Sequence, residues 1–242
     1  MKKLYTKNEL TFSIIWIVLY VILLSTADSI SADLSIEKLV TAPLCVVMTA
    51  FLFFWVKKND LMGKYGLCKF KGDLKKYLFF LPLVILCSTN LWNGVTLNIS
   101  PLESLLYAIS MLCVGFLEEL IFRGFLFRAM CKDNVKTAII VSSITFGIGH
   151  IVNLLNGAEL LSTLLQVCYA IAIGFLFTIL VYYGKSLIPC IISHCIVNSL
   201  SCFAVESGKI LDIIAAIAII VISISYTLWI IKSEKTTKEP AN

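Results

Sequence analysis

The chain has 242 residues, of which 59% are hydrophobic and 14% are charged, and its formal net charge is +5. Soluble domains average roughly 45–50% apolar and about 25% charged residues, so this composition, with a mean hydropathy of +0.94, excludes a soluble globular protein. The positive charge does not indicate nucleic-acid binding, because most of it lies in the connections between long apolar runs.

Eight hydrophobic segments follow one another along the chain. A membrane-spanning helix needs about 20 apolar residues, and in lipid only helices or closed barrels satisfy every backbone polar group. These runs are long and continuous, whereas barrel strands are short and alternate. The sequence therefore predicts an all-α, polytopic membrane bundle of about eight transmembrane helices. The predicted segments are 12–30, 40–56, 77–97, 102–125, 137–155, 160–183, 187–205 and 212–231.

The segments form one predicted membrane domain, 12–231, between a cytoplasmic N-terminus, 1–11, and a cytoplasmic tail, 232–242. Segment 77–97 is the weakest, because Pro82 and residues 90–94 interrupt it. Segment 12–30 has the flanks of a secretory signal, but we expect it to stay as a membrane anchor. The nine cysteines include no CxxC pair and lie mostly in apolar runs, so we expect buried thiols rather than disulfides.

The positions of Lys and Arg predict the orientation of the bundle, because cytoplasmic connections carry an excess of these residues. Of the 20 in this chain, 18 fall in alternate connections and near the two chain ends, and the others are Lys38 and Lys209. The segments that hold the 18 are 2–7, 57–76, 123–136, 185 and 232–238. This distribution predicts a multi-pass protein of the cell membrane with both termini in the cytoplasm.

Ionisable residues inside predicted spans are candidates for function, because a charge in lipid is costly. Segment 102–125 contains Glu118, Glu119 and Arg123. Residues four apart share a helix face, so we expect Glu119 to pair with Arg123, whereas Glu118 lies about 100° around the helix without such a partner. An unpaired buried carboxylate suits a general base or acid. The alternative is that both glutamates only hold Arg123 at the membrane edge.

Both histidines of the chain, His150 and His194, also lie inside predicted spans. His194 and Asn198 are four residues apart, so on a helix they face the same way and form a donor pair suited to an oxyanion. Gly147 and Gly149 are expected to let another backbone approach His150 closely. Counted along the helices from the nearest basic residues, the two histidines and Glu118 meet towards the cytoplasmic half of the membrane.

These residues form three motifs, EExxxR, FxxxH and HxxxN, in that order within residues 115–200. Together the motifs resemble those of the CAAX protease and bacteriocin-processing family, also called the Abi family, and every motif position is intact. The resemblance implies an intramembrane endopeptidase with an eight-helix core, here at about 78–205. The motif residues are Glu118, Glu119, Arg123, Phe146, His150, His194 and Asn198.

The resemblance also implies a role for each motif residue. Glu118 and His150 would activate the attacking water, and His194 and Asn198 would stabilise the oxyanion of the tetrahedral intermediate. The residues that would support the site are Glu119, Arg123 and Phe146.

A metal ion is the open alternative to this mechanism. Two histidines and a glutamate match a catalytic zinc ligand set, so a zinc ion would be held by Glu118, His150 and His194. No HExxH motif occurs, and a carboxylate bound to zinc is not free to act as the base, so we expect no cofactor. Ser193 and Cys195 adjoin His194 and point to other helix faces, so we do not expect either to be a nucleophile.

The sequence thus predicts an intramembrane endopeptidase that hydrolyses a peptide or membrane-associated protein near the cytoplasmic face, in bacteriocin or pheromone processing or in self-immunity. Its predicted partners are this substrate and the lipid bilayer, with no nucleic acid. The alternatives are a non-catalytic immunity or scaffold protein of the same fold, and a proton-coupled transporter, because proton relays also use buried Glu and His. Intact motifs favour the enzyme, and no matching pair of broken half-spans supports the transporter.

Overall fold

The computed structural model describes residues 1–97, 99–205 and 208–236. Within them every regular element is a helix, apart from one isolated β-bridge between Val95 and Ala204, which confirms the all-α prediction. The α-helices are α1 (Lys2–Lys7), α2 (Glu9–Asp33), α3 (Thr41–Lys58), α4 (Leu81–Cys87), α5 (Pro101–Glu118), α6 (Phe127–Met130), α7 (Val135–Gly149), α8 (Leu160–Gly184), α9 (Ile188–Leu200) and α10 (Lys209–Thr236). The other helical turns are η1 (Leu78–Phe80), η2 (Thr89–Leu91), η3 (Glu119–Leu126), η4 (His150–Asn156) and η5 (Ser201–Phe203).

Several helices begin where the sequence provides a cap. Asn8 and Asn134 accept a backbone hydrogen bond at the starts of α2 and α7, which satisfies one of the free donors of a first turn. At α5, the Ser100 hydroxyl accepts from the Glu103 nitrogen, the Glu103 carboxylate accepts from the Ser100 nitrogen, and Pro101 follows the cap. This reciprocal capping box fixes the start of the helix that carries the two adjacent glutamates.

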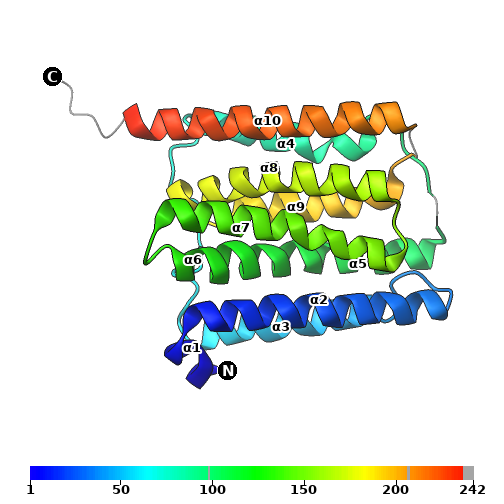
Figure 1. Cartoon of the computed structure of the whole chain (residues 1–242), viewed down its shortest axis with the longest axis horizontal. Coiled ribbons are helices and arrows are strands. Elements are labelled where there is room, and N and C mark those ends of the chain that lie inside the picture. The colour runs from blue at the N-terminus through cyan, green and yellow to red at the C-terminus, as the bar shows by residue number, and fades with distance from the viewer. Residues whose placement is uncertain (98, 206–207, 237–242) are drawn as a thin grey trace.

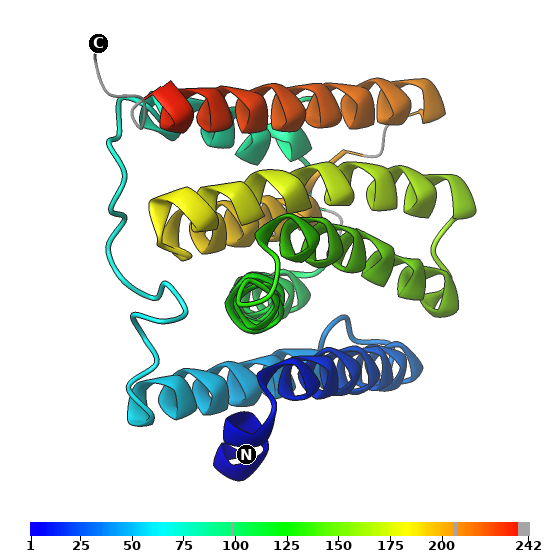
Figure 2. The same ribbon diagram turned by 60° about the vertical axis from the view of Figure 1, so that its left-hand side comes forward.

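The long helices lie side by side in layers (Figure 1). Helices α2 and α3 form one outer layer, α10 and α4 form the opposite one, and α5, α7, α8 and α9 lie between them (Figure 2). Helix α8 packs on α10 and α7, and α5 packs on α9 and α3. The N-terminus and the last turn of α10 lie at the same end of the bundle, which we call the basic end; the other is the opposite end.

In the part of the chain that the structure describes, six helical segments are long and apolar enough to cross a membrane. Two predicted spans, 77–97 and 187–205, form shorter apolar helices, Leu78–Cys87 and Ile188–Phe203. At 1.5 Å per residue these reach only about 15 and 24 Å, against a hydrocarbon thickness of about 30 Å. Segment 77–97 is cut short because residues 78–80 have positive φ, and because the Asn90 side chain donates to the Val197 carbonyl on α9. Helix α10 extends five residues beyond the predicted span, to Thr236, and residues 237–242 of the predicted tail lie outside the described residues.

The contact between α7 and α8 depends on glycine. A Cβ atom added at Gly147 would lie 2.8 Å from the backbone nitrogen of Ile171, and one at Gly174 would lie 3.0 Å from Cα of Ser143. The close approach expected at Gly147 is therefore confirmed. The same expectation for Gly149 is wrong, because no atom lies within 4 Å of a Cβ built there. Small residues at helix contacts are what lets membrane helices pack backbone to backbone.

This difference predicts opposite effects for two alanine substitutions on one helix. Gly147→Ala should lower the thermal unfolding midpoint in detergent, because backbone atoms of α8 must move, at a cost of about 1–3 kcal/mol. Gly149→Ala, the matched control, should leave the midpoint unchanged or raise it, because alanine favours the helix. Equal midpoints for the two variants would contradict the close packing of α7 on α8.

Candidate active site

Helix α5 continues past Glu118 as a π-helix, η3, before α6 begins. All eight residues of η3 are buried. From α7, the Ser142 hydroxyl donates a hydrogen bond of 2.9 Å to the Phe122 carbonyl oxygen in this wider turn. π-Helical turns are rare and occur frequently at functional sites. The two adjacent glutamates therefore lie at the junction between an α-helix and a π-helix.

The predicted pair of Glu119 and Arg123 is confirmed. Arg123 Nη1 donates to Glu119 Oε1 at 3.0 Å, and neither side chain is exposed. The guanidinium carbon lies 3.9 Å from the ring centroid of Phe146, a cation–π contact. Among the described residues, Nε and Nη2 of Arg123 have no hydrogen-bond partner. Counting Arg123 with the basic connections is thus wrong, because this cation lies in the interior and depends on Glu119 and Phe146.

His194, on α9, lies between the two glutamates. Its Nδ1 is 2.9 Å from Glu119 Oε1, and its Nε2 is 3.4 Å from Glu118 Oε2. A carboxylate beside one ring nitrogen sets which nitrogen carries the proton, so Nδ1–H donates to Glu119 and Nε2 faces Glu118. Sequence reasoning assigned Glu119 to Arg123 alone and missed this contact, because His194 lies 75 positions away.

A glycine brings α9 close enough for His194 to reach both carboxylates. A Cβ atom added at Gly115 would lie 2.8 Å from the backbone nitrogen of Cys195. The Cys195 thiol donates to the Leu112 carbonyl at 3.1 Å, and the Ser193 hydroxyl donates to the Pro189 carbonyl at 2.9 Å. Both side chains that flank His194 therefore bond to backbone carbonyls, and the expectation that neither is a nucleophile stays a prediction.

In the part of the chain that the structure describes, the Glu118 side chain has no partner on its own helix, as expected, but it has one on another helix. The Tyr20 hydroxyl, on α2, donates to Glu118 Oε1 at 2.7 Å. Among the described residues, Glu118 Oε2 has no hydrogen-bond partner, although this side chain is buried. Tyr20 is the site residue that sequence reasoning missed, because one tyrosine in an apolar span carries no signal of its own. Through this contact with Glu118, α2 forms part of the site, in addition to its expected role as a membrane anchor.

The motif residues with predicted catalytic roles line one cavity of about 390 Å³. They are Glu118, His150, His194 and Asn198. His150 opens η4 directly after α7, and its ring packs edge-on against Phe146 with centroids 5.4 Å apart. Asn198 lies one turn beyond His194 on α9. The structure thus brings together residues from three helical segments that the sequence separates by up to 80 positions.

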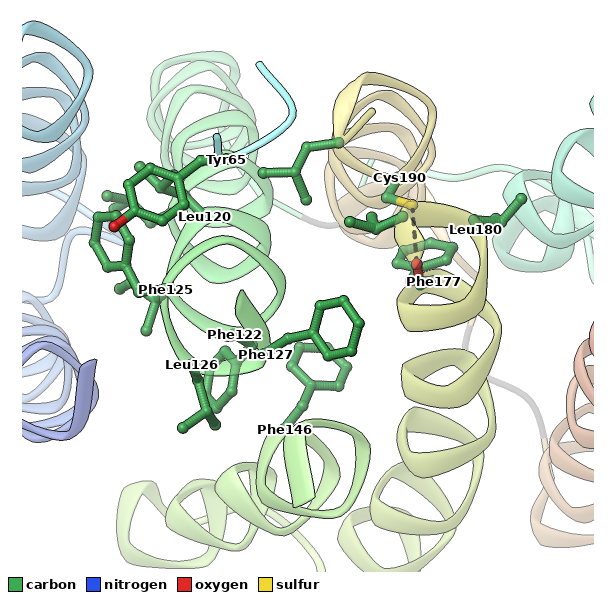
Figure 3. Close-up of a cluster of buried hydrophobic side chains, with 14 of the residues drawn as sticks. Tyr65, Leu120, Phe122, Phe125, Leu126, Phe127, Phe146, Phe177, Leu180 and Cys190 are labelled. Carbon is green, nitrogen blue, oxygen red and sulfur yellow. Dashed lines mark hydrogen bonds between the residues drawn. The ribbon is translucent and has the colours of Figure 1, made fainter. Parts of the chain in front are cut away.

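The rings of Phe122, Phe146 and Phe177 form the inner end of this cavity. The rings of Phe122 and Phe146 pack edge to face, with centroids 5.4 Å apart (Figure 3). From these rings the cavity extends past the motif residues towards the α2–α3 and η4–α8 connections, at the opposite end of the bundle. Sequence reasoning placed the motif residues towards the cytoplasmic half of the membrane and expected cleavage near that face, whereas the cavity extends from them away from the basic end.

The predicted zinc ligands can be checked against the positions of their side chains in the structure. Within residues 1–97, 99–205 and 208–236, no group of three or more His, Cys, Asp or Glu side chains is placed to hold a metal ion. Glu118, His150 and His194 have the donor types that zinc prefers, but in this structure they are not arranged as a ligand set.

Residues 100–200 match the family model described as type II CAAX prenyl endopeptidase Rce1-like. The matched range begins at the capping serine of α5, ends at the last residue of α9 and contains all three motifs. The family resemblance is therefore confirmed over this range. No curated protein and no solved structure matches the chain.

The buried ion pair predicts an order of stabilities. Arg123→Ala leaves the Glu119 carboxylate without its cation, and breaking one partner of a buried pair costs about 3–5 kcal/mol. The double variant Glu119→Gln, Arg123→Gln removes both charges and should unfold at a higher temperature than Arg123→Ala, as measured by thermal unfolding in detergent. If the two variants are equally stable, His194 alone compensates the charge of Glu119.

Proposed function

We propose that this chain is an intramembrane endopeptidase that hydrolyses a peptide or membrane-associated protein, as its match to a protease family supports. The observation that carries the proposal is the convergence of Glu118, His150, His194 and Asn198 on one cavity inside the bundle. Peptide hydrolysis needs an activated water and a stabilised oxyanion, and a carboxylate, two imidazoles and an amide supply both. Precursors of bacteriocins or peptide pheromones are the substrates we propose.

In this mechanism Glu118 is the general base. Its Oε1 accepts from Tyr20, which leaves the buried Oε2, without a hydrogen-bond partner among the described residues, to take a proton from the attacking water. His150 lines the same cavity and is the second group proposed to act on this water. Tyr20 holds the orientation of the carboxylate, so the proposed site includes a helix outside the matched range 100–200.

His194 and Asn198 are the proposed oxyanion donors. His194 donates from Nδ1 to Glu119, and its role as an oxyanion donor requires a second proton on Nε2, the nitrogen that faces Glu118, for donation to the substrate oxygen. The Asn198 amide lies one helical turn away on the same face of α9 and also lines the cavity. Glu119 and Arg123 keep the His194 ring in place, because a ring fixed by a buried carboxylate need not reorganise during the reaction.

We also propose that α4 and α9 complete eight passes and that the basic end faces the cytoplasm. The connections that follow α3, α6 and α8 all lie at the basic end (Figure 1). The chain therefore returns to the basic end after every second pass, as it must if α4 and α9 each count as one pass. These connections carry most of the Lys and Arg residues of the chain, and such connections are cytoplasmic in most membrane proteins.

The first test of the proposed function is Glu118→Gln, which keeps the shape of the side chain and removes the base. Cleavage of a membrane peptide substrate should be lost, while expression and membrane insertion remain. Glu159→Gln is the matched control: Glu159 is exposed, pairs with Lys209 and does not line the cavity, so its activity should remain. Substantial activity in Glu118→Gln would contradict the general-base role.

The second test separates oxyanion stabilisation from metal catalysis. Asn198→Ala should lower kcat by about 10²–10³ with little change in KM, as loss of an oxyanion donor does. Activity should survive chelators, and elemental analysis should find well under one zinc per chain. Stoichiometric zinc that disappears in His150→Ala would overturn this mechanism, because zinc held by Glu118, His150 and His194 would occupy the proposed base.

A further inference from the structure

We infer that the substrate reaches the motif residues from the opposite end of the bundle, and that the segment cleaved is a polar stretch of polypeptide exposed on the non-cytoplasmic face of the membrane. This inference rests on the proposed peptidase function and on the proposed orientation, and it names the membrane face and the chemical class of the substrate.

The residues that line the cavity show which half of the bundle it occupies. On α2 its lining runs from Tyr20 towards Asp28, and on α5 from Glu118 back towards Tyr107. Beyond α7 it follows η4 as far as Asn156, and on α9 it continues past the motif residues to Ser201. Each of these directions leads away from the basic end (Figure 1). Four segments of the chain therefore agree that the cavity occupies the half of the bundle at the opposite end.

The basic end is closed by packing. Beyond Phe122 the chain runs towards the basic end through buried side chains of η3 and α6, including Phe125 and Phe127, which Figure 3 labels. The connection between α3 and α4 covers the turn between α8 and α9: Leu187 N donates to the Gly66 carbonyl at 2.7 Å, and the Ser186 hydroxyl donates to the Cys68 carbonyl at 2.6 Å. A polypeptide arriving from the basic end would have to displace this core.

The Lys and Arg residues of the connections then indicate which membrane face each end of the bundle occupies. The connections at the opposite end hold only two Lys or Arg residues, Lys38 and Lys209. Both are in ion pairs, Lys38 with Asp28 at 2.8 Å and Lys209 with Glu159 at 2.9 Å. An end without unpaired Lys or Arg in its described connections is typical of the non-cytoplasmic face, because positive charge is retained in the cytoplasm. The cavity therefore opens away from the cytoplasm.

The side chains between the motif residues and the opposite end indicate what the cavity binds. Four are amides besides the motif residue Asn198, and they are Asn90, Asn153, Asn156 and Gln166. Each amide offers both a donor and an acceptor, as a peptide group does, so the set suits an extended polypeptide backbone. Asn90 already donates to the Val197 carbonyl and Asn153 to Gln166 Oε1. A hydrocarbon chain would satisfy none of the remaining amide donors and acceptors, at a cost of about 1–3 kcal/mol for each one that is shut off from water. The chemistry therefore favours a polar peptide segment over a lipid chain.

The test measures which face of the membrane reaches the cavity, in the full-length chain with its native cysteines replaced. Asn156→Cys lies at the exposed rim, Ser25→Cys lies inside the cavity, and Asp133→Cys is the control at the basic end. Intact bacterial cells are treated with a membrane-impermeant polymer maleimide for the rim and a small charged thiosulfonate for the interior. Ala158→Cys, in the adjacent exposed turn, replaces the rim variant if that variant does not accumulate.

The expected result is full labelling of Asn156→Cys and Ser25→Cys in intact cells, and labelling of Asp133→Cys only after permeabilisation. The reverse pattern would overturn the assignment of the face, and Ser25→Cys that reacts in neither state would overturn the open cavity. None of these results depends on cleavage, so they stand apart from the test of Glu118→Gln. In peptide analysis of active and Glu118→Gln cells, the products should map to non-cytoplasmic segments, and products confined to cytoplasmic segments would also overturn the inference.

Discussion

A carboxylate buried among packed helices must be neutralised where it lies, and Glu119 meets this requirement from two directions. Arg123 reaches it from one turn further along the same helical segment, and His194 reaches it from α9. Because the carboxylate cannot move to water, both partners are held in fixed positions. The ring of His194 is thereby oriented with its second nitrogen towards Glu118, so one buried charge sets the geometry of the whole site.

Phe146 extends this constraint to the FxxxH motif. Its ring lies against the Arg123 guanidinium, and it also packs edge-on against Phe122, His150 and His194. A single aromatic side chain therefore stabilises the buried cation and holds both histidines at the inner end of the cavity. This gives a physical reason for a phenylalanine one turn before His150, which the motif alone does not explain.

The two ends of the bundle differ in the same way in packing and in charge. The basic end is filled by aromatic and aliphatic side chains and covered by a connection that is hydrogen-bonded to the α8–α9 turn. The opposite end holds the cavity, its amide side chains and two paired lysines. Helix α2 joins the two halves, because Tyr20 at its middle bonds to Glu118 while Asp28 near its end lies at the rim. The site is thus incomplete without a helix that precedes the matched range.

The sequence alone determined what depends on local patterns. Long apolar runs predicted the helices, and i,i+4 spacing predicted the Glu119–Arg123 pair, because each depends on residues a few positions apart. The three motifs also predicted which residues would meet. Only the tertiary structure decided that Tyr20 and His194 contact the glutamates, that two spans shorten, and that the cavity faces the opposite end. These features depend on how closely the helices pack. Gly115, for example, lets α5 approach Cys195, which is 80 positions away in the sequence, and no local sequence pattern encodes such a contact.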